Sequence, residues 1–543
     1  MNDLLVELQR QNIDVSVDGD KLKLDIPHGQ NVDALLKKVQ SNKDELLAFV
    51  KNRAAKSIPI APDREYYDLS SAQKRLYFLH EFNSETLAYN VPIAIRIKGE
   101  LDLDKLTEAI RSLVDRHEIL RTRFDMFNGL PKQIISESIE IPIEIVNIDE
   151  AQVEEMVESF YQSFDLKNGP LIRVKIGEVS SVEHVMLVDM HHIIADATSL
   201  EVFKRDLMHF YSNEPLPELI VQYKDVVEWQ QSDVQQELLE NQKDFWIKEF
   251  QTIPVSNLPL DFPRPAVKSF EGANLNFQIT GQKFELLKKI ARDNGLTVFM
   301  FTLAIYKIFL SKICNNEDVT IGTPVAGRNH KDLKDSIGMF INSLVIRSFP
   351  KAEITIADYL QELKEKFFTC LENQNYQYDD LVDELKIERS ASKNPLYDAR
   401  FVFQNFEKTE NELADLTMEV IDKQKQEAQF DLSLIVREEK DLLFCDFNYS
   451  TELFEKTTIK KFIQYFNATL DGVLENSSTR IGDIDILLKE EKDLLNTFNS
   501  TSVDYPAGRT ILDYFVSQVA QTPDRAAVVS GGSSLSYAAL EER

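Results

Sequence analysis

Two proline-containing stretches interrupt the hydrophobic pattern of this chain, and they limit how its 543 residues can be divided among cores. The first, SIPIAPDREYY, follows a short helical pattern near the N-terminus, and the second, TIPVSNLPLDFPRPAVKS, covers residues 252–269. Proline fixes φ and lacks a backbone donor, so such stretches favour linkers over helices and strands. Because a domain usually holds roughly 100–200 residues, we expect three or four folded units.

The patterns between these interruptions predict the order of the units. From Tyr66 to about residue 490, helical and strand periodicities alternate, which indicates an α/β (α+β) class built as two lobes. The expected division is an N-terminal domain at 1–57, a linker at 58–65, a first lobe at 66–250, a second lobe at 251–490, and a linker with the start of a further domain at 491–543.

The N-terminal segment predicts a small αββαα unit. Ile13, Val15 and Val17 alternate with polar residues, Asp18-Gly19 supplies a turn, and a second alternating run follows, as in a β-hairpin. The unpaired edge of the second strand could accept another strand. The residues that we expect to present this edge are Lys21, Leu22, Lys23, Leu24, Asp25 and Ile26.

Composition excludes several classes of function. A formal charge of −29 argues against a generic nucleic-acid or anionic-membrane surface, because both need clustered Lys and Arg. Three widely spaced cysteines predict neither a disulfide framework nor a zinc site, and they favour a reducing cytoplasm. The apolar stretch from Val298 to Leu310 is too short to span a bilayer and predicts a buried helix.

The segment VMLVDMHHIIADATS, residues 185–199, carries the most chemical information. An apolar strand ends in His191 and His192, and Asp196 follows four residues later. A neutral imidazole at the end of a buried strand could accept a proton near pH 7. From the residues alone, a pair of packed, hydrogen-bonded histidines is the competing interpretation. Zinc binding is disfavoured because no cluster elsewhere completes a ligand set.

This segment resembles a known signature. HHIIADA is similar to the HHxxxDG motif of the condensation domains of nonribosomal peptide synthetases, which are related in fold to chloramphenicol acetyltransferase. Six further segments resemble condensation-domain motifs in the same order: SSAQKRLYFL at 70–79, RHEILRTRF at 116–124, YKDVVEW at 223–229, IGMFINS at 337–343, NQNYQYDDLV at 373–382 and RSASKNPLYD at 389–398.

The resemblance implies two chloramphenicol-acetyltransferase-like lobes in a V-shaped pseudo-dimer with a tunnel between them. It places His192 beside the reacting amine and gives His191 a mainly structural role. Asp196 is expected to form an ion pair with an arginine of the RHEILRT segment and so to support the catalytic loop; Arg116 is the first choice and Arg121 the second.

Other residues are implied to lie near the substrate arms. The residues expected at the approach of the acceptor arm are Ala197, Ser199, Asn342 and Ser343. Ala197 stands where the family usually has glycine, which raises the question of whether that position needs a positive φ angle. Gln377 replaces a usual proline and is given no functional weight.

The implied reaction is amide formation by attack of a carrier-bound aminoacyl amine on an upstream carrier-bound acyl or peptidyl thioester. The substrates would be attached as thioesters to the 4'-phosphopantetheine arms of partner carrier domains. This chain itself is expected to hold no covalently bound cofactor and no metal. The amine, of pKa about 8, must be neutral and held in line. Sequence does not choose between His192 as general base and His192 as a positioning group.

The two ends of the chain imply partners. The N-terminal unit resembles the β-hairpin docking domains that recognise the C-terminal tail of an upstream synthetase subunit; a dimerisation or capping element is the alternative. From about Asn499 the chain resembles the opening of an adenylation domain, and we expect it to stop inside that domain. Gly531-Gly532-Ser533 follows a strand pattern, which disfavours a carrier site.

Alternative functions remain open from sequence. A starter-type condensation domain, which acylates an amino acid from a separate acyl donor, shares the motifs but would gain nothing from a docking domain. An epimerisation domain normally follows a carrier, and heterocyclisation domains replace the histidines with aspartate. A non-catalytic docking scaffold with a silent histidine loop is the remaining alternative.

Overall fold

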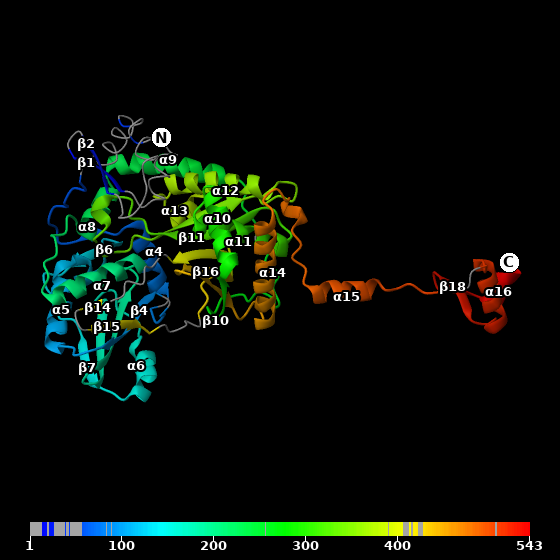
Figure 1. Cartoon of the computed structure of the whole chain (residues 1–543), viewed down its shortest axis with the longest axis horizontal. Helices are drawn as coiled ribbons and strands as arrows, with labels where there is room; N and C mark the ends of the chain where they lie inside the picture. Colours follow the sequence, from blue (N-terminus) through cyan, green and yellow to red (C-terminus); the bar gives the residue numbers. More distant parts are fainter. Residues whose placement is uncertain are drawn as a thin grey trace. The chain divides into compact units, whose positions relative to one another are not determined.

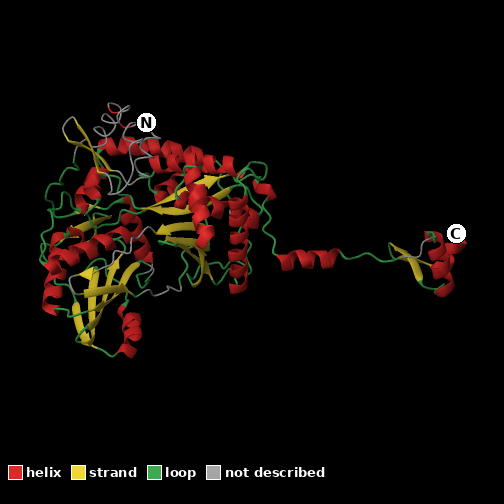
Figure 2. Cartoon of the chain, viewed as in Figure 1, coloured by secondary structure: helices red, strands yellow, loops and turns green. Residues whose placement is uncertain are grey.

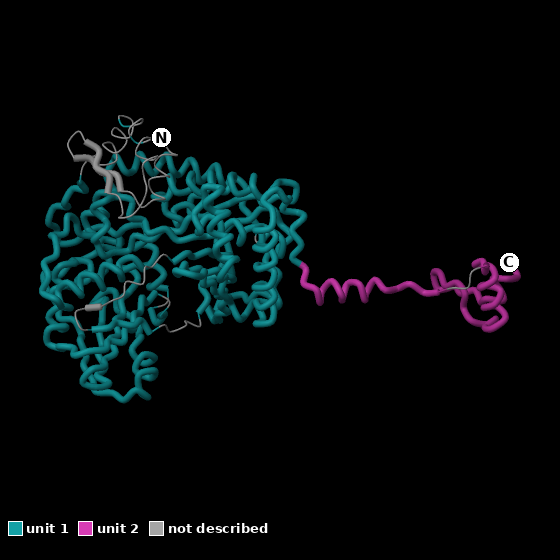
Figure 3. The backbone as a smooth tube through the Cα atoms, viewed as in Figure 1, with its two compact units in different colours: residues 1–486 teal, residues 487–543 magenta. Residues whose placement is uncertain are grey.

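The structure is a computed structural model of the whole chain, and it divides into two compact units, residues 1–486 and 487–543 (Figure 3). Each unit is considered by itself. The residues that the structure describes are 14–18, 21–25, 39, 43, 57–82, 84–87, 89–255, 257–388, 390–404, 412–413, 416–421, 427–504 and 508–543.

The N-terminal hairpin is present. Strand β1 (Asp14–Asp18) pairs antiparallel with β2 (Lys21–Asp25), with Val17 opposite Leu22. The alternation of apolar residues predicted this pairing, and the backbone register confirms it. Ile26 and the helices expected around the hairpin lie outside the described residues.

We call residues 66–250 the N-lobe, and its elements are shown in Figures 1 and 2. In chain order they are β3 (Tyr67–Asp68), α4 (Ser71–Phe82), β4 (Asn90–Lys98), α5 (Leu103–Arg116), η1 (Glu118–Arg121), β5 (Thr122–Phe127), β6 (Leu130–Ile135), β7 (Ile143–Asn147), η2 (Glu150–Gln152), α6 (Val153–Phe160), β8 (Ile172–Ser180), β9 (Glu183–His191), α7 (Ala197–Ser212), α8 (Tyr223–Gln230) and α9 (Asp233–Glu249).

The N-lobe is organised around a six-stranded sheet of order β14-β15-β4-β9-β8-β7. Strand β9 pairs antiparallel with both β4 and β8, and only its first residue is not buried. Helices α5 and α7 pack against one face of this sheet, whereas α6 covers Val185 and Leu187 on the other. Cover on both faces explains why β9 is a continuous apolar run instead of an alternating one.

We call residues 251–486 the C-lobe. Its elements are β10 (Gly272–Thr280), α10 (Gly281–Asp293), α11 (Val298–Cys314), β11 (Val319–Val325), η3 (Lys331–Leu333), β12 (Asn342–Ser348), α12 (Ile356–Glu372), α13 (Tyr378–Glu384), β13 (Ala399–Gln404), β14 (Glu412–Leu413), β15 (Leu416–Val420), β16 (Leu432–Glu438), β17 (Leu442–Ser450), α14 (Lys456–Glu475) and η4 (Ile481–Asp483).

The C-lobe core lies between one sheet face and four helices. The sheet has the order β10-β17-β16-β13-β11-β12, and α11 packs beside α10, α12 and α14 (Figure 1). The predicted buried helix is confirmed, since every residue from Met300 to Ser311 is buried. Among the described residues no single helix is long and apolar enough to cross a membrane; α10 and α11 pass that test only as a pair bent by 102°.

Three segments cross between the lobes. Strand β15 comes from the C-lobe sequence but pairs with β4 of the N-lobe sheet. The segment 333–340 places Ile337 and Phe340 in the N-lobe core. Helix α9, although it precedes residue 250, places Trp246 in the C-lobe core. Each lobe is therefore completed by chain from the other.

The second unit holds α15 (Lys489–Asn499), α16 (Ile511–Gln521), β18 (Ala526–Ser530), β19 (Ser533–Ser536) and α17 (Tyr537–Glu542). Strands β18 and β19 pair antiparallel through Gly531 and Gly532, both of which have positive φ. The strand pattern expected before Gly531 is confirmed by β18. The two glycines form a hairpin turn and do not open a helix.

Candidate active site

The histidine loop joins the central strand of the N-lobe to helix α7. His191 is the last residue of β9, and Asp196 is the N-cap of α7. The loop between them is held by backbone hydrogen bonds: the His192 N–H donates to the Tyr89 carbonyl at 2.7 Å, and the Ile194 N–H donates to the His191 carbonyl at 3.0 Å. The strand thus fixes both imidazoles at the end of the sheet.

His191 is packed inside the N-lobe. Its ring lies edge-on to the rings of His80 and Phe164, with centroids 5.5 and 6.1 Å away, and its Nδ1 accepts a hydrogen bond from the Ile193 N–H at 3.1 Å. Burial, with smaller contributions from His80 and His192, lowers the pKa of His191 to about 3. The imidazole is neutral at pH 7, and its contacts are those of a structural residue.

His192 differs from its neighbour because it remains partly accessible to solvent. Its Nδ1 atom is buried and has no hydrogen-bond partner among the described residues, which leaves Nε2 as the nitrogen available to a ligand. Burial lowers the pKa of His192. The Asp196 carboxylate and the backbone carbonyls of His192 and Ala195 raise this pKa, but by less. A neutral imidazole can accept a hydrogen bond or a proton.

The Asp196 carboxylate is the centre of a buried cluster that joins the two lobes. Oδ2 accepts from Arg328 Nη1 at 2.8 Å and from the Phe340 N–H at 3.0 Å; Oδ1 accepts from Arg328 Nη2 at 3.1 Å and from the Ser199 N–H at 2.8 Å. The Arg328 side chain is 7% exposed and stacks over the Phe340 ring at 4.2 Å. This bidentate pair fastens the histidine loop to C-lobe chain.

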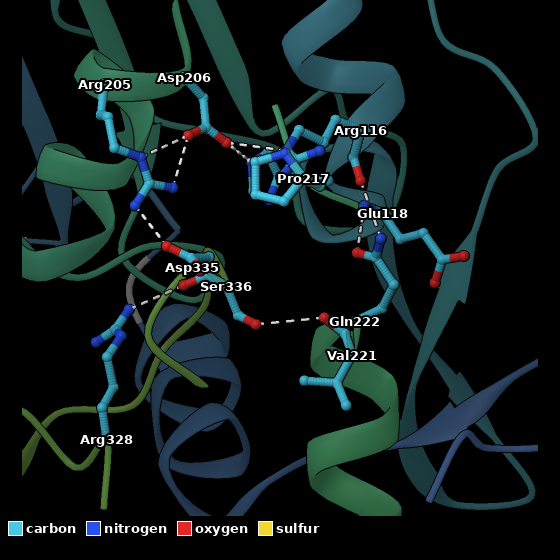
Figure 4. Close-up of polar contacts among 11 residues, drawn as sticks. Arg116, Glu118, Arg205, Asp206, Pro217, Val221, Gln222, Arg328, Asp335 and Ser336 are labelled. Carbon is cyan, nitrogen blue, oxygen red and sulfur yellow. Dashed lines mark hydrogen bonds and ion pairs between the residues drawn. The ribbon is translucent and has the colours of Figure 1, made fainter. Parts of the chain in front are cut away.

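The expected partner of Asp196 is therefore wrong. Arg116 donates from Nε to Asp206 at 3.0 Å and from Nη2 to the Pro217 carbonyl at 2.6 Å, so it supports α7 ten residues beyond Asp196 (Figure 4). Arg121 donates to the Ser136 carbonyl. Both arginines make contacts within the N-lobe, Arg116 with α7 and Arg121 with the residue that follows β6.

Ser199 belongs to the same cluster. It is fully buried, and its hydroxyl lies 2.8 Å from Asp196 Oδ1, 2.9 Å from the Gly338 carbonyl and 3.0 Å from Arg328 Nη2. Gly338 is required here because a Cβ would lie 2.0 Å from the Tyr223 ring. The Ser199 hydroxyl is thus a structural group of the Asp196 cluster, whereas we expected it to approach the acceptor arm.

The motifs distant in sequence converge on this loop. Tyr223 of the YKDVVEW motif lies 3.0 Å from the Ser70 hydroxyl and donates to the Met339 carbonyl at 2.6 Å. Gln73 of the first motif donates to the Ile193 carbonyl at 3.2 Å. Three of the six further motifs, SSAQKRLYFL, YKDVVEW and IGMFINS, therefore supply contacts that hold the histidine loop.

The other three residues expected at the approach of the acceptor arm are Asn342, Ser343 and Ala197, and they differ in burial and in hydrogen bonding. Asn342 is buried and donates to the carbonyls of Gln374 and Tyr376 at 2.8 Å each, so its amide is engaged within the protein. Ser343 is half-buried and hydrogen-bonds the Tyr397 side chain. Ala197 is exposed at the first position of α7 and is not among the described positive-φ residues. The usual glycine is therefore not required here for backbone conformation.

Sequence reasoning missed two arginines. Arg328 follows β11 in the segment AGRNH, and Arg75 of α4 forms an ion pair with Asp379 of α13 at 3.2 Å while lowering the pKa of His192. Gly327, with φ of +67°, was the available signal for Arg328, because a tight turn after a strand often presents a functional residue. In the part of the chain that the structure describes, no group of three His, Cys, Asp or Glu residues could hold a metal ion.

Comparisons with known proteins identify the family. Residues 63–496 match the family model of the condensation domain, and residues 1–52 match that of the TubC N-terminal docking domain. The chain is 38% identical to bacitracin synthase 3 of Bacillus licheniformis over 96% of its own length and 39% identical to tyrocidine synthase 3 of Brevibacillus parabrevis over 90%. It spans only 8% of the length of each of these relatives.

Solved structures support the same fold. The X-domain from teicoplanin biosynthesis superposes with a TM-score of 0.72 at 24% identity, covering 80% of this chain and all of that one. A four-domain nonribosomal peptide synthetase superposes with a TM-score of 0.71 at 23% identity, covering 89% of this chain and 38% of that one. The match over residues 63–496, which is most of the chain, shows that the chain belongs to the condensation-domain family.

Proposed function

We propose that this chain joins two carrier-bound substrates by an amide bond. The acceptor amine attacks the donor thioester carbonyl, a C–N bond forms, the C–S bond breaks, and the amine proton passes to the departing thiol. The observation that carries this proposal is the partly accessible His192, held at the end of β9 with its Nδ1 buried.

His192 acts through Nε2 in this proposal. A neutral imidazole accepts a hydrogen bond from the incoming amine and either takes its proton or aligns its lone pair with the carbonyl. Burial lowers the pKa of His192, which favours the neutral form. Asp196 is engaged with Arg328 and Phe340, so it acts by positioning the loop and not by accepting a proton from the imidazole.

The substrates would arrive on 4'-phosphopantetheine arms of donor and acceptor carrier domains. The match of residues 1–52 to a docking domain supports recruitment of an upstream synthetase subunit through its C-terminal tail. Strand β2 lies at the end of a two-stranded sheet, where an added strand could pair with its free edge. We place residues 21–26 at that contact.

The second unit would be the start of an adenylation domain, which makes the downstream partner part of the same synthetase. The helix, the hairpin and the glycine turn of residues 511–536 support this assignment. We place the chain in the cytoplasm, since its three cysteines are free thiols.

Reconstitution with two loaded carriers tests the proposed reaction. A donor carrier with an acyl or peptidyl group and an acceptor carrier with an aminoacyl group are mixed with the chain, and the amide product is measured by mass spectrometry. We expect His192→Ala to lower the rate of product formation by roughly 100-fold or more, because general-base or positioning groups contribute on that scale.

A matched variant keeps this test interpretable. His209→Gln removes a half-exposed imidazole on α7, 3.2 Å from Glu214 and outside the histidine loop, and should condense at the wild-type rate. Thermal unfolding checks that His192→Ala is folded. Equal rates for wild type and a folded His192→Ala would contradict the proposal, and product formed only from free acyl coenzyme A would indicate a starter-type enzyme.

A further inference from the structure

The C-lobe sheet has one apolar and one polar face. On β13, Ala399 and Phe401 are buried in the core against the helices, so the alternating Arg400 and Val402 point to the opposite face. Strand register puts further polar residues on that second face: Asn274, Asn276, Gln278, Ser433, Gln404, Arg437, Asp446 and Asn448. Arg400 thus lies on the sheet face opposite the core helices, among polar residues of which Ser433 and Asn448 are buried.

Arg400 differs from the neighbouring cations in lacking an acidic partner. Arg437 on the same face lies 3.1 Å from Glu439, and Arg264 is paired with Asp431. For Arg400, the described residues supply one contact of its guanidinium, the ring of Phe430 at 5.2 Å, and no carboxylate within ion-pair distance. A half-buried guanidinium stacked on an aromatic ring keeps its in-plane donors available to a ligand.

The surroundings connect Arg400 to the histidine loop. Phe430 stacks on Tyr397, centroids 5.3 Å apart, and Tyr397 packs on Tyr378 of α13 at 5.4 Å. The ion pair of Asp379 with Arg75 ties α13 to α4 of the N-lobe. Burial is the main cause of the lowered pKa of both His192 and Arg400, and the Arg75 guanidinium lowers each further.

The ring of Tyr397 fills the space over Gly322 beside this position. Gly322 of β11 is the register partner of Arg400, and a Cβ on Gly322 would lie 2.0 Å from the Tyr397 ring. Tyr397 therefore lies over β11 beside Arg400, and its side chain hydrogen-bonds that of Ser343. Among the described residues, Arg400 therefore lies beside the buried ring of Tyr397 and has no carboxylate within ion-pair distance.

We propose that Arg400 determines specificity by binding a carboxylate on one of the two acyl groups that the chain joins, which makes an acidic aminoacyl or acyl residue its substrate class. This inference rests on the proposed condensation reaction. The carboxylate could belong to the donor or to the acceptor, and both sources have the same chemistry. A planar guanidinium suits a carboxylate because it can form two parallel hydrogen bonds.

The test compares acidic substrates with their neutral isosteres on the full chain. Glutamyl and glutaminyl groups, and separately aspartyl and asparaginyl groups, are loaded as thioesters on the donor carrier and then on the acceptor carrier. We expect the wild type to favour the acid over the amide by roughly 10- to 100-fold in one arm, as for hydrogen bonds to a charged group. The arm that shows the preference identifies the source.

Variants at position 400 should change this ratio. Arg400→Met keeps a long side chain without charge and should bring the acid-to-amide ratio to about one, whereas Arg400→Lys should retain part of the preference. Arg437→Met is the matched control, since it removes a paired arginine from the same face and should keep the wild-type ratio.

The outcomes separate this inference from the condensation reaction itself. Product without acid preference in either arm would overturn the role of Arg400 and leave condensation intact. An equal loss for acids and amides in Arg400→Met would also overturn it, because it would indicate a contact common to all substrates, such as the phosphate of the arm, or a folding defect. No product from any pair with the wild type would instead contradict the proposed function.

Discussion

Two buried aspartates on the same helix serve different parts of the molecule. Asp196, at the N-cap of α7, binds Arg328 of the C-lobe across 132 positions of sequence. Asp206, in the middle of α7, binds Arg116, His117 and Arg205, all of which belong to the N-lobe. The Asp196 carboxylate holds the histidine loop against the C-lobe, and the Asp206 carboxylate holds α7 against other parts of the N-lobe.

The two aspartates differ in how well water could solvate the cations that would be left behind if each carboxylate were removed. In the described part of the chain, Asp196 has one cationic partner, Arg328, whose side chain is 7% exposed, whereas Asp206 is shared by the largely buried Arg116, the buried His117 and Arg205, which is 37% exposed. Removing a carboxylate from a fully buried arginine leaves an uncompensated charge, while a partly exposed arginine can be hydrated again. The cross-lobe pair should therefore contribute more to stability than the pair within the N-lobe.

Asp196→Ala gives the largest expected effect. The free energy of unfolding should fall by about 3–5 kcal/mol, because the buried Arg328 loses its charge partner. Urea unfolding followed by the fluorescence of Trp229 and Trp246 measures it, and hydrogen exchange should increase in residues 326–341. The double variant Asp196→Ala/Arg328→Met, which removes both partners, should recover part of the loss. If Asp196→Ala alone cost less than about 1 kcal/mol, the contrast with Asp206 would not hold.

Asp206→Asn should cost less, about 1–3 kcal/mol, because water can reach Arg205. Hydrogen exchange should increase in α5 and α7 but not in residues 326–341, since Asp206 makes its contacts inside the N-lobe. Faster exchange in 326–341, as large as that caused by Asp196→Ala, would show that the two carboxylates form one cooperative unit.

Acid should weaken the Asp206 cluster through His117, whose Nε2 lies 2.9 Å from Asp206 Oδ2. Burial lowers the pKa of His117 below its usual value, so the unfolded chain binds more protons and stability falls as the pH drops from about 6.5 to that lowered pKa. His117→Gln should flatten this slope by up to about 1.4 kcal/mol per pH unit. Parallel stability curves for both proteins between pH 7 and 5 would contradict the assignment.

Asp335→Asn should have the smallest effect. Asp335 forms an ion pair with Arg205 across the lobes (Figure 4), but the two side chains are 43% and 37% exposed. Such pairs contribute about 0.2–1 kcal/mol and are screened by salt. Urea unfolding at low and at 1 M salt measures this. A loss as large as that of Asp196→Ala would mean that crossing the lobes, and not burial, makes a pair strong.

Local patterns predicted the elements better than their partners. The apolar run before His191 predicted the buried strand β9, and the largely apolar stretch from Val298 to Leu310 predicted helix α11. In the same way, alternation at Val15 and Val17 predicted the N-terminal hairpin. The partner of Asp196 was assigned to Arg116 because that arginine lies in a recognised motif, yet the arginine that binds it lies in AGRNH.

By itself, the sequence determined the mixed α/β class, the histidine loop and the order of the motifs around it, since periodicity and residue type act over a few turns of chain. Only the tertiary structure decided that β15 completes the N-lobe sheet, that Arg328 holds Asp196, and that no carboxylate of the described residues pairs with Arg400. Ion pairs and strand pairings between distant segments depend on how the tertiary fold brings those segments together. Local periodicity carries no information about such long-range contacts.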